Sequence, residues 1–389
     1  MTPETDPSPL WRLGFRPFFL FASVFALFSI LIWLMVFLGA ARPVGHFDPI
    51  LWHSHEMIYG YATAVIAGFV LTASQNWTGR PGIRGRHLKL LFLIWVLGRI
   101  LMSTVPGPSL IVAFVDLAFY PTLAVSMIPY LRPADMKVER VFFAYFALYF
   151  TGDLLMHLES LRVVRGYSLR GALLGLDTTI LMIVFMGGRL IPFFTESEKA
   201  KTQPRSRVWA EVGSHLSAWA FLVSQFLTPT SWIAAGIAFA ACILHTVRLA
   251  LWYVKRVRRV ALLWVLYSSY LWIALGFGLF GFTSLSLIPL GPSVHALTIG
   301  GLGIMTYGMM SRVSLGHTGR ELRASKPVIA GYIALNVACA FRVLGPLLAS
   351  AWLTAWLVVS GAFWVGAFAL FLWIYSPMLL RPRVDGRPG

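Results

Sequence analysis

Two histidines and a glutamate stand at the start of a long apolar run. The stretch reads WHSHEM over residues 52–57 and leads into apolar residues that continue to Ala73. Imidazole nitrogens and carboxylate oxygens are metal ligands and proton carriers, and each carries a free-energy penalty inside an apolar segment. The stretch therefore predicts a functional site, with His53, His55 and Glu56 as its first candidates.

The spacing of the two histidines separates their side chains. Residues two apart on an α-helix point about 200° away from each other, so His53 and His55 do not ligate one metal ion in a regular helix. His53 shares a face with Glu56 and Met57. An imidazole beside a thioether suits copper in its soft reduced state. The alternative for His53 is a place at the membrane interface, where amphipathic rings gather at the level of the lipid headgroups.

A second copy of this pattern lies 240 residues further along the chain. The segment HEMIYGYATAVIAGFVLTASQNWTGR at 55–80 aligns without a gap with HALTIGGLGIMTYGMMSRVSLGHTGR at 295–320. The alignment pairs His55 with His295, two glycines with two glycines, and one closing Thr-Gly-Arg with the other. Two imidazoles on opposed helices are a natural axial pair for haem iron, so His55 and His295 are candidate haem or metal ligands.

A weaker match relates the middle of the chain to its last third. Arg189 aligns with Arg312, and Thr195 with Thr318, at an offset of 123 residues. Together with the offset of 240, this match predicts internal repeats of four helices each.

The composition indicates which elements must position these residues. The chain has 389 residues, of which 58% are hydrophobic and only 12% charged, against about 25% charged in soluble domains. Because only internally hydrogen-bonded backbone is tolerated in a bilayer, each crossing takes about 20 apolar residues as a helix. The sequence therefore predicts an all-α polytopic membrane bundle of about twelve transmembrane helices. The predicted spans lie near 18–40, 53–75, 88–103, 109–130, 140–158, 171–194, 208–227, 231–253, 261–285, 293–312, 327–348 and 351–376.

Lysine and arginine placement predicts the orientation. Most of the 32 basic residues fall on one side of the membrane if both termini are cytoplasmic, as the positive-inside rule requires. We therefore expect residues 1–389 to form a single integral membrane domain with short cytoplasmic tails at about 1–14 and 378–389. The net charge of +17 is explained by a basic face on anionic lipid, so no nucleic-acid partner is expected.

Further polar residues lie at depths where function is expected. His157, Asp116 and Asp177, together with Asp153, fall at outer ends or in outer halves of spans, where an interhelical hydrogen bond is the alternative role. His245 is a candidate for a second site in an inner half. At the inner face, Arg189, His317 and Arg320 are candidates for anion binding, with helix-end capping as the alternative. Only two cysteines occur, which excludes a Cys-x-x-Cys-His attachment site, so any haem is held without a covalent bond.

Five phrases resemble the NnrS family of bacterial membrane proteins. They are GFRPFF at 14–19, WHSHEM at 52–57, NWTGRPG at 76–82, GGRLIPFFT at 187–195 and SLGHTGR at 314–320. The resemblance implies a twelve-span protein of the bacterial inner membrane that carries haem and copper. It also implies a role in nitric oxide metabolism and in resistance to nitrosative stress during denitrification or host attack. It strengthens His53, His55 and His295 as metal ligands, whereas Tyr267 stands where relatives often carry histidine.

The residues and the resemblance together predict a haem-copper membrane protein that binds, senses or turns over nitric oxide. Its haem is expected to be b-type, and its metal site is expected near the periplasmic face. If the protein is an enzyme, we expect a metal-dependent oxidoreductase acting on nitric oxide or a related nitrogen oxide. The alternatives are a secondary transporter, for which twelve spans and internal repeats are ordinary features, and a non-catalytic factor that assembles metal sites.

Overall fold

The computed structural model describes residues 8–41, 45–198 and 203–387, and these residues form only helices, turns and irregular segments. The ends of the two predicted tails, 1–7 and 388–389, lie outside the described residues. The helices in the first half are η1 Pro9–Trp11, α1 Phe15–Phe37, α2 Pro49–His55, η2 Glu56–Ala62, α3 Thr63–Thr78, α4 Gly85–Thr104, α5 Leu110–Leu117, α6 Phe119–Leu131, η3 Ala134–Met136, α7 Val141–Ser160 and α8 Ser168–Ser197. Those in the second half are α9 Val208–Leu227, α10 Trp232–Trp252, η4 Lys255–Arg259, α11 Ala261–Ser284, α12 Leu290–His295, η5 Ala296–Gly303, α13 Ile304–His317, α14 Lys326–Leu348, η6 Ser350–Trp352 and α15 Leu353–Leu380.

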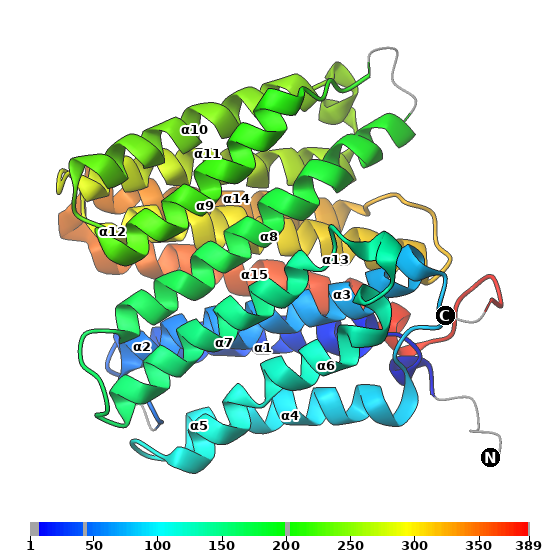
Figure 1. Cartoon of the computed structure of the whole chain (residues 1–389), viewed down its shortest axis with the longest axis horizontal. Helices are drawn as coiled ribbons and strands as arrows, with labels where there is room; N and C mark the ends of the chain where they lie inside the picture. The colour runs from blue at the N-terminus through cyan, green and yellow to red at the C-terminus, as the bar shows by residue number, and fades with distance from the viewer. Residues whose placement is uncertain (1–7, 42–44, 199–202, 388–389) are drawn as a thin grey trace. The chain divides into compact units, whose positions relative to one another are not determined.

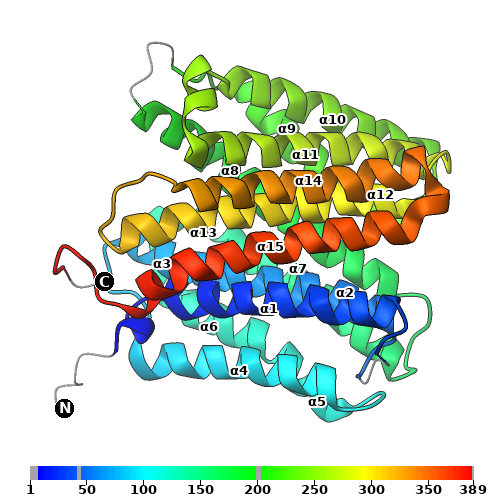
Figure 2. The same ribbon diagram turned by 180° about the vertical axis from the view of Figure 1, so that it is seen from behind.

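Each of the twelve predicted spans coincides with a helical segment (Figures 1 and 2). Ten of the described segments are long and apolar enough to cross a bilayer. The two others are α9, which carries Glu211, His215 and Gln225, and the segment 290–317, which is rich in glycine, serine and threonine. The prediction of an all-α polytopic membrane bundle is confirmed, and the chain is a multi-pass membrane protein.

Two of the described segments are π-helical, and they occupy equivalent places in the repeat. η2 begins directly after His55, and η5 begins directly after His295. A π-helix bonds each amide five residues back, is rare, and is frequent at functional sites. The structure therefore shows at backbone level the repeat that the offset of 240 residues predicts.

A buried side chain completes the hydrogen bonding at each π segment. The indole of Trp95 donates to the carbonyl of Gly60 at 2.9 Å, and the hydroxyl of Ser269 donates to the carbonyl of Gly301 at 2.7 Å. Because the bilayer interior offers no water, every such carbonyl needs a protein donor.

The glycine shared by both π segments lets a side chain of a neighbouring helix approach the backbone. A Cβ on Gly60 would lie 2.7 Å from Nη1 of Arg99, and a Cβ on Gly300 would lie 2.9 Å from Sγ of Cys339. Arg99 and Cys339 are themselves 240 residues apart. The repeat thus extends to the packing of α4 and α14 against the two π segments.

The chain divides into two compact units. Unit 1 comprises residues 1–175, 313–321 and 371–389, and unit 2 comprises residues 176–312 and 322–370. In unit 1, α1 packs on α3 and η2, α3 on α6, and α6 on α7. In unit 2, α9, α10 and α11 lie side by side (Figure 1), and α12 and η5 pack on α14 (Figure 2).

The GFRPFF phrase is explained by helix packing in unit 1. Gly14 allows α1 to meet α3, because a Cβ there would lie 2.6 Å from Cβ of Leu71. The backbone N–H of Phe15 donates to the hydroxyl of Thr72 at 2.9 Å. The buried guanidinium of Arg16 donates to three carbonyls at the C-terminal end of α15, at 2.8, 2.9 and 3.4 Å. This arginine therefore supplies donors for carbonyls that the end of a helix leaves unpaired.

Candidate metal centre

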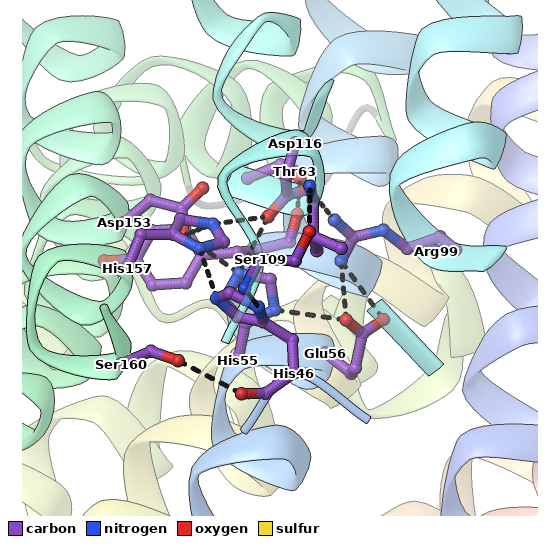
Figure 3. A network of polar contacts seen from close by, with 12 residues as sticks. His46, His55, Glu56, Thr63, Arg99, Ser109, Asp116, Asp153, His157 and Ser160 are labelled. Atoms are coloured by element: carbon purple, nitrogen blue, oxygen red, sulfur yellow. Dashed lines mark hydrogen bonds and ion pairs between the residues drawn. The ribbon is translucent and has the colours of Figure 1, made fainter. Parts of the chain in front are cut away.

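Four buried side chains in unit 1 bring metal-ligating atoms together: His55, Asp116, Asp153 and His157 (Figure 3). One ligand atom from each lies within 4.8 Å of the others. Nε2 of His55 is 2.9 Å from Oδ1 of Asp153 and 3.0 Å from Oδ2 of Asp116. Nε2 of His157 is 3.2 Å from the same oxygen of Asp116 and 3.5 Å from that of Asp153. Two imidazoles and two carboxylates thus converge on one point.

One oxygen of this group lacks a hydrogen-bond partner among the described residues. Oδ2 of Asp153 is buried and accepts no hydrogen bond. A buried carboxylate oxygen without a donor costs a free energy of about 1–3 kcal/mol or more. Because this oxygen lies beside other metal-ligating groups, it is a candidate metal-ligand atom.

A buried ion pair borders the four ligands. Arg99 donates through Nη1 to both carboxylate oxygens of Glu56 at 3.1 Å and through Nη2 to Oδ1 of Asp116. Oε1 of Glu56 also lies 3.1 Å from Nδ1 of His55. The glutamate therefore orients the histidine ring, and the arginine offsets part of the negative charge.

The loop between α1 and α2 closes the group on one side. The backbone N–H of Ser109 donates to Nδ1 of His46 at 3.1 Å, and Nε2 of His46 lies 3.0 Å from Nδ1 of His157. Burial and the two neighbouring histidines lower the pKa of His46 to about 4, so this ring is neutral at neutral pH. The neutral ring accepts at Nδ1 and therefore donates from Nε2 to His157.

The local sequence explains how each ligand is placed. Asp48 caps α2 by accepting from two backbone N–H groups, at 3.0 and 3.1 Å, and Pro49 follows at the first helical position. Asp153 and His157 are four residues apart on α7, so they share one helix face. Gly98 on α4 leaves room for Asp116, whose Oδ1 would lie 2.8 Å from a Cβ at that position.

A haem does not fit at His55 as the structure places it. Both nitrogens of this ring face carboxylates at 2.9–3.1 Å, and the side chain is fully buried. An axial ligand must present one bare nitrogen to a flat macrocycle. The surroundings of His55 as the structure places them therefore do not fit a haem, and its predicted role as a metal ligand stays a prediction.

His53 and Met57, two further residues of the WHSHEM phrase, are not part of this group of four. The His53 ring stacks on Trp33 with centroids 4.5 Å apart and an interplanar angle of 12°. α2 is a regular helix up to His55, and the two rings diverge as the helical spacing requires. Met57 lies half-buried in η2 and is not one of the four grouped residues.

His295 belongs to unit 2, so the prediction that it pairs with His55 stays a prediction. Its Nδ1 contacts the carbonyl of Gly291 on its own helix at 2.7 Å. The neighbouring core consists of Ala296, Cys339 and Val343. These neighbours are apolar or weakly polar, in contrast to the charged groups around His55.

His245 takes part in a separate buried network of unit 2. Its Nδ1 lies 2.7 Å from the hydroxyl of Tyr270, which accepts from Arg248 at 2.7 Å. Arg248 in turn pairs with Glu211 and is fully buried. Among the described residues, the acceptor for the Tyr270 hydroxyl proton is Nδ1 of His245. Because Nδ1 accepts this hydrogen bond, the proton of the neutral imidazole lies on Nε2. A protonated Nε2 does not bind metal, so metal binding here requires the network to rearrange.

The remaining predicted residues are distributed over both units. Asp177 is buried in unit 2, and its Oδ1 lacks a partner among the described residues. Arg189 is exposed and lies over the ring of Phe185 at 5.6 Å. His317 packs on Phe15 at 5.5 Å. Arg320 is half-buried and donates to the carbonyl of Thr318 at 3.4 Å.

Three residues at the centre were not predicted from the sequence as ligands or as their neighbours: Asp153, which was expected only as one of several polar residues in outer halves of spans, Arg99 and His46. A signal for the first existed, because Asp153 precedes His157 by four residues on a predicted helix and both fall at its outer end. Arg99 is a charged residue inside a predicted span, which is itself an indication of function. Nothing in the sequence indicates that the His46 loop folds back onto α7.

Comparisons with known proteins give one result. No curated protein matches the chain. The family model described as NnrS protein matches residues 9–383, which is nearly the whole chain, so this protein belongs to the NnrS family.

Proposed function

We propose that this protein acts in the bacterial inner membrane in the response to nitric oxide, as a metal-containing protein with its metal centre near the periplasmic face. Membership of the NnrS family supports the link to nitric oxide. The observation that carries the metal dependence is the buried group of His55, Asp116, Asp153 and His157 with its unpartnered carboxylate oxygen.

Haem and copper are the cofactors that we expect from the family. When bound, they would supply a redox-active metal that can coordinate a diatomic nitrogen oxide. His53, Met57 and His295 stay candidate ligands for haem and copper, as predicted from the sequence. None of these three residues belongs to the four-residue centre. Beside that centre, Glu56 would orient the His55 ring, and Arg99 would orient the Asp116 carboxylate and offset part of the negative charge.

The experiment combines a metal count with a cellular readout. The full-length protein is purified in detergent after expression with haem supplied, and iron, copper and the optical spectrum are measured. Cells lacking nitric oxide defences are then tested for survival under a nitric oxide donor, with the wild-type chain and with Asp153→Asn. We expect bound metal and protection in the wild type, and loss of protection in the variant. A wild-type protein without bound metal and without any effect on nitric oxide tolerance would overturn the proposal.

Secondary transport is the second candidate function. It is favoured by the paired π segments of η2 and η5, because transporters often combine internal repeats with irregular helices at their binding sites. Accumulation of a substrate by vesicles that contain the purified protein, without any consumption of nitric oxide, would favour it.

A further inference from the structure

We propose that the buried centre of unit 1 holds a bare divalent cation of the hard to borderline class, such as Mn²⁺, Fe²⁺ or Zn²⁺. Its ligands are His55, Asp116, Asp153 and His157. The inference deepens the proposed function and rests on its metal dependence. It names an ion that is separate from haem and from reduced copper.

The present spacing of the ligand atoms already suits such an ion. A tetrahedral ion with bonds of about 2.05 Å holds neighbouring ligand atoms about 3.3 Å apart. Contacts of 2.9, 3.0, 3.2 and 3.5 Å join the two histidine nitrogens to the two carboxylate oxygens in the structure. These four of the six distances lie within about 0.4 Å of that value, and the other two pairs of ligand atoms lie within 4.8 Å of each other. The unpartnered oxygen of Asp153 is available as a further ligand atom.

The fixed charges around the centre match a divalent ion. Three carboxylates, those of Glu56, Asp116 and Asp153, face one guanidinium, that of Arg99. With both histidines neutral as ligands, the protein groups carry a net charge of −2. A divalent cation brings the buried group to neutrality, whereas Cu⁺ leaves a negative charge and Fe³⁺ a positive one. Because an uncompensated charge is costly at such burial, the centre selects for a charge of +2.

The chemical type of the ligands points the same way. Reduced copper prefers thiolate and thioether sulfur, whereas imidazole and carboxylate suit Mn²⁺, Fe²⁺ and Zn²⁺. The four grouped residues contain no sulfur. The carboxylates on both edges of the His55 ring leave no room for a macrocycle.

Ion binding reverses one hydrogen bond of the centre. A ligating histidine keeps its proton on the nitrogen away from the metal and donates it to a neighbour. For His157 this nitrogen is Nδ1, which accepts from His46 in the structure. His46 must therefore become the acceptor and release the N–H of Ser109. We expect the His46 ring to turn when the ion binds. Bonds to the ion replace the direct contacts between the histidine nitrogens and the carboxylate oxygens, while Glu56 keeps its contact with Nδ1 of His55.

The test uses the full-length protein in detergent, stripped with a chelator and desalted. Mn²⁺, Zn²⁺, Fe²⁺ without oxygen, and Cu⁺ without oxygen are added one at a time. Bound ion per chain is then measured by mass spectrometry of the elements, and Co²⁺ is used as a spectroscopic probe of ligand geometry. We expect one tightly held divalent ion per chain, a Co²⁺ spectrum of low coordination number, and no retention of Cu⁺ at this centre.

Asp153→Asn is the decisive variant, and Asp177→Asn is its matched control. Both replace a buried carboxyl group, but Asp177 belongs to unit 2. We expect the ion to be lost in the first variant and kept in the second. Glu56→Gln keeps all four ligands and should weaken binding roughly 10- to 100-fold, as changes to groups that orient ligands do. If Asp153→Asn elutes as an aggregate, His157→Gln takes its place.

The outcomes separate this inference from the proposed function. Equal retention of the divalent ion by wild type and Asp153→Asn, or retention of Cu⁺ alone, overturns the inference. A haem spectrum that persists in Asp153→Asn while the divalent ion is lost supports it. A divalent ion at the centre in a protein without effect on nitric oxide tolerance supports the inference and overturns the proposed function.

Discussion

Among the residues around the candidate metal centre, Arg99 is the one whose replacement should lower the free energy of unfolding most. Its guanidinium is only 6% exposed and contacts Glu56 and Asp116, which are equally buried. Arg99→Met keeps the bulk of the side chain and removes the charge. Removing one partner of a buried ion pair typically costs about 3–5 kcal/mol, because the remaining charge stays buried without compensation. We expect the free energy of unfolding of the metal-free protein to fall by about this amount.

Glu56→Gln separates the ion pair from general packing. We expect it to cost less than Arg99→Met, because it leaves Asp116 to balance the arginine. In the double variant the loss should fall below the sum of the single losses by about 1–3 kcal/mol, as for residues within one ion-pair network.

The assay is reversible unfolding in mixed micelles, monitored by circular dichroism, with a chelator present throughout. Arg86→Met is the matched control, because Arg86 lies on the same helix α4 and is exposed. Its effect should stay within about 0.5 kcal/mol. If Arg99→Met costs no more than this control, or if the two single losses simply add, the pairing of Arg99 with the carboxylates is not what stabilises the centre.

Three further predictions concern the repeat and the C-terminal segment. Gly60→Ala and Gly300→Ala should each lower the free energy of unfolding by about 1–3 kcal/mol, because a Cβ at either place meets neighbouring side chains. A Cβ on Gly236 of α10 meets nothing within 4 Å, so Gly236→Ala should raise the free energy of unfolding by up to about 1 kcal/mol. Thermal unfolding of the three variants checks these values. Arg16→Gln should expose the end of α15 to protease, because its charge-assisted bonds to the carbonyls are lost; unchanged cleavage would contradict this role. The C-terminal segment 381–387 is attached through Arg383 to the carbonyl of His317 and through the N–H of Val384 to the carbonyl of Thr318. The hydrogen bonds from the Arg383 side chain hold the pKa of Asp385 well below its usual range, so this attachment should stay constant from pH 8 to pH 5 and weaken only in stronger acid. Asp385→Asn should raise cleavage there at neutral pH.

Most of the helices were predictable because a long apolar segment indicates where a chain crosses a bilayer. The twelve ranges, the pairing of His55 with His295 in sequence, and the family phrases all follow from residues read along the chain. Which helices pack together does not follow, because lipid-facing and protein-facing apolar residues look alike in sequence. The proximity of His55 on α2 to Asp153 on α7 is such a case. For this reason the sequence indicated several members of the centre separately and did not indicate that they form one group.

The two halves of the repeat show what the π segments do and do not indicate. Both carry a histidine, a π segment and a glycine under a neighbouring side chain. Glu56 and Arg99 in unit 1, however, correspond to Ala296 and Cys339 in unit 2 at the same offset of 240 residues. The irregular backbone is therefore a property of the repeat, whereas the charges of Glu56 and Arg99 have no counterpart at the aligned positions 296 and 339. A π segment with a histidine is thus a weaker indication of a metal centre than the carboxylates that surround the ring.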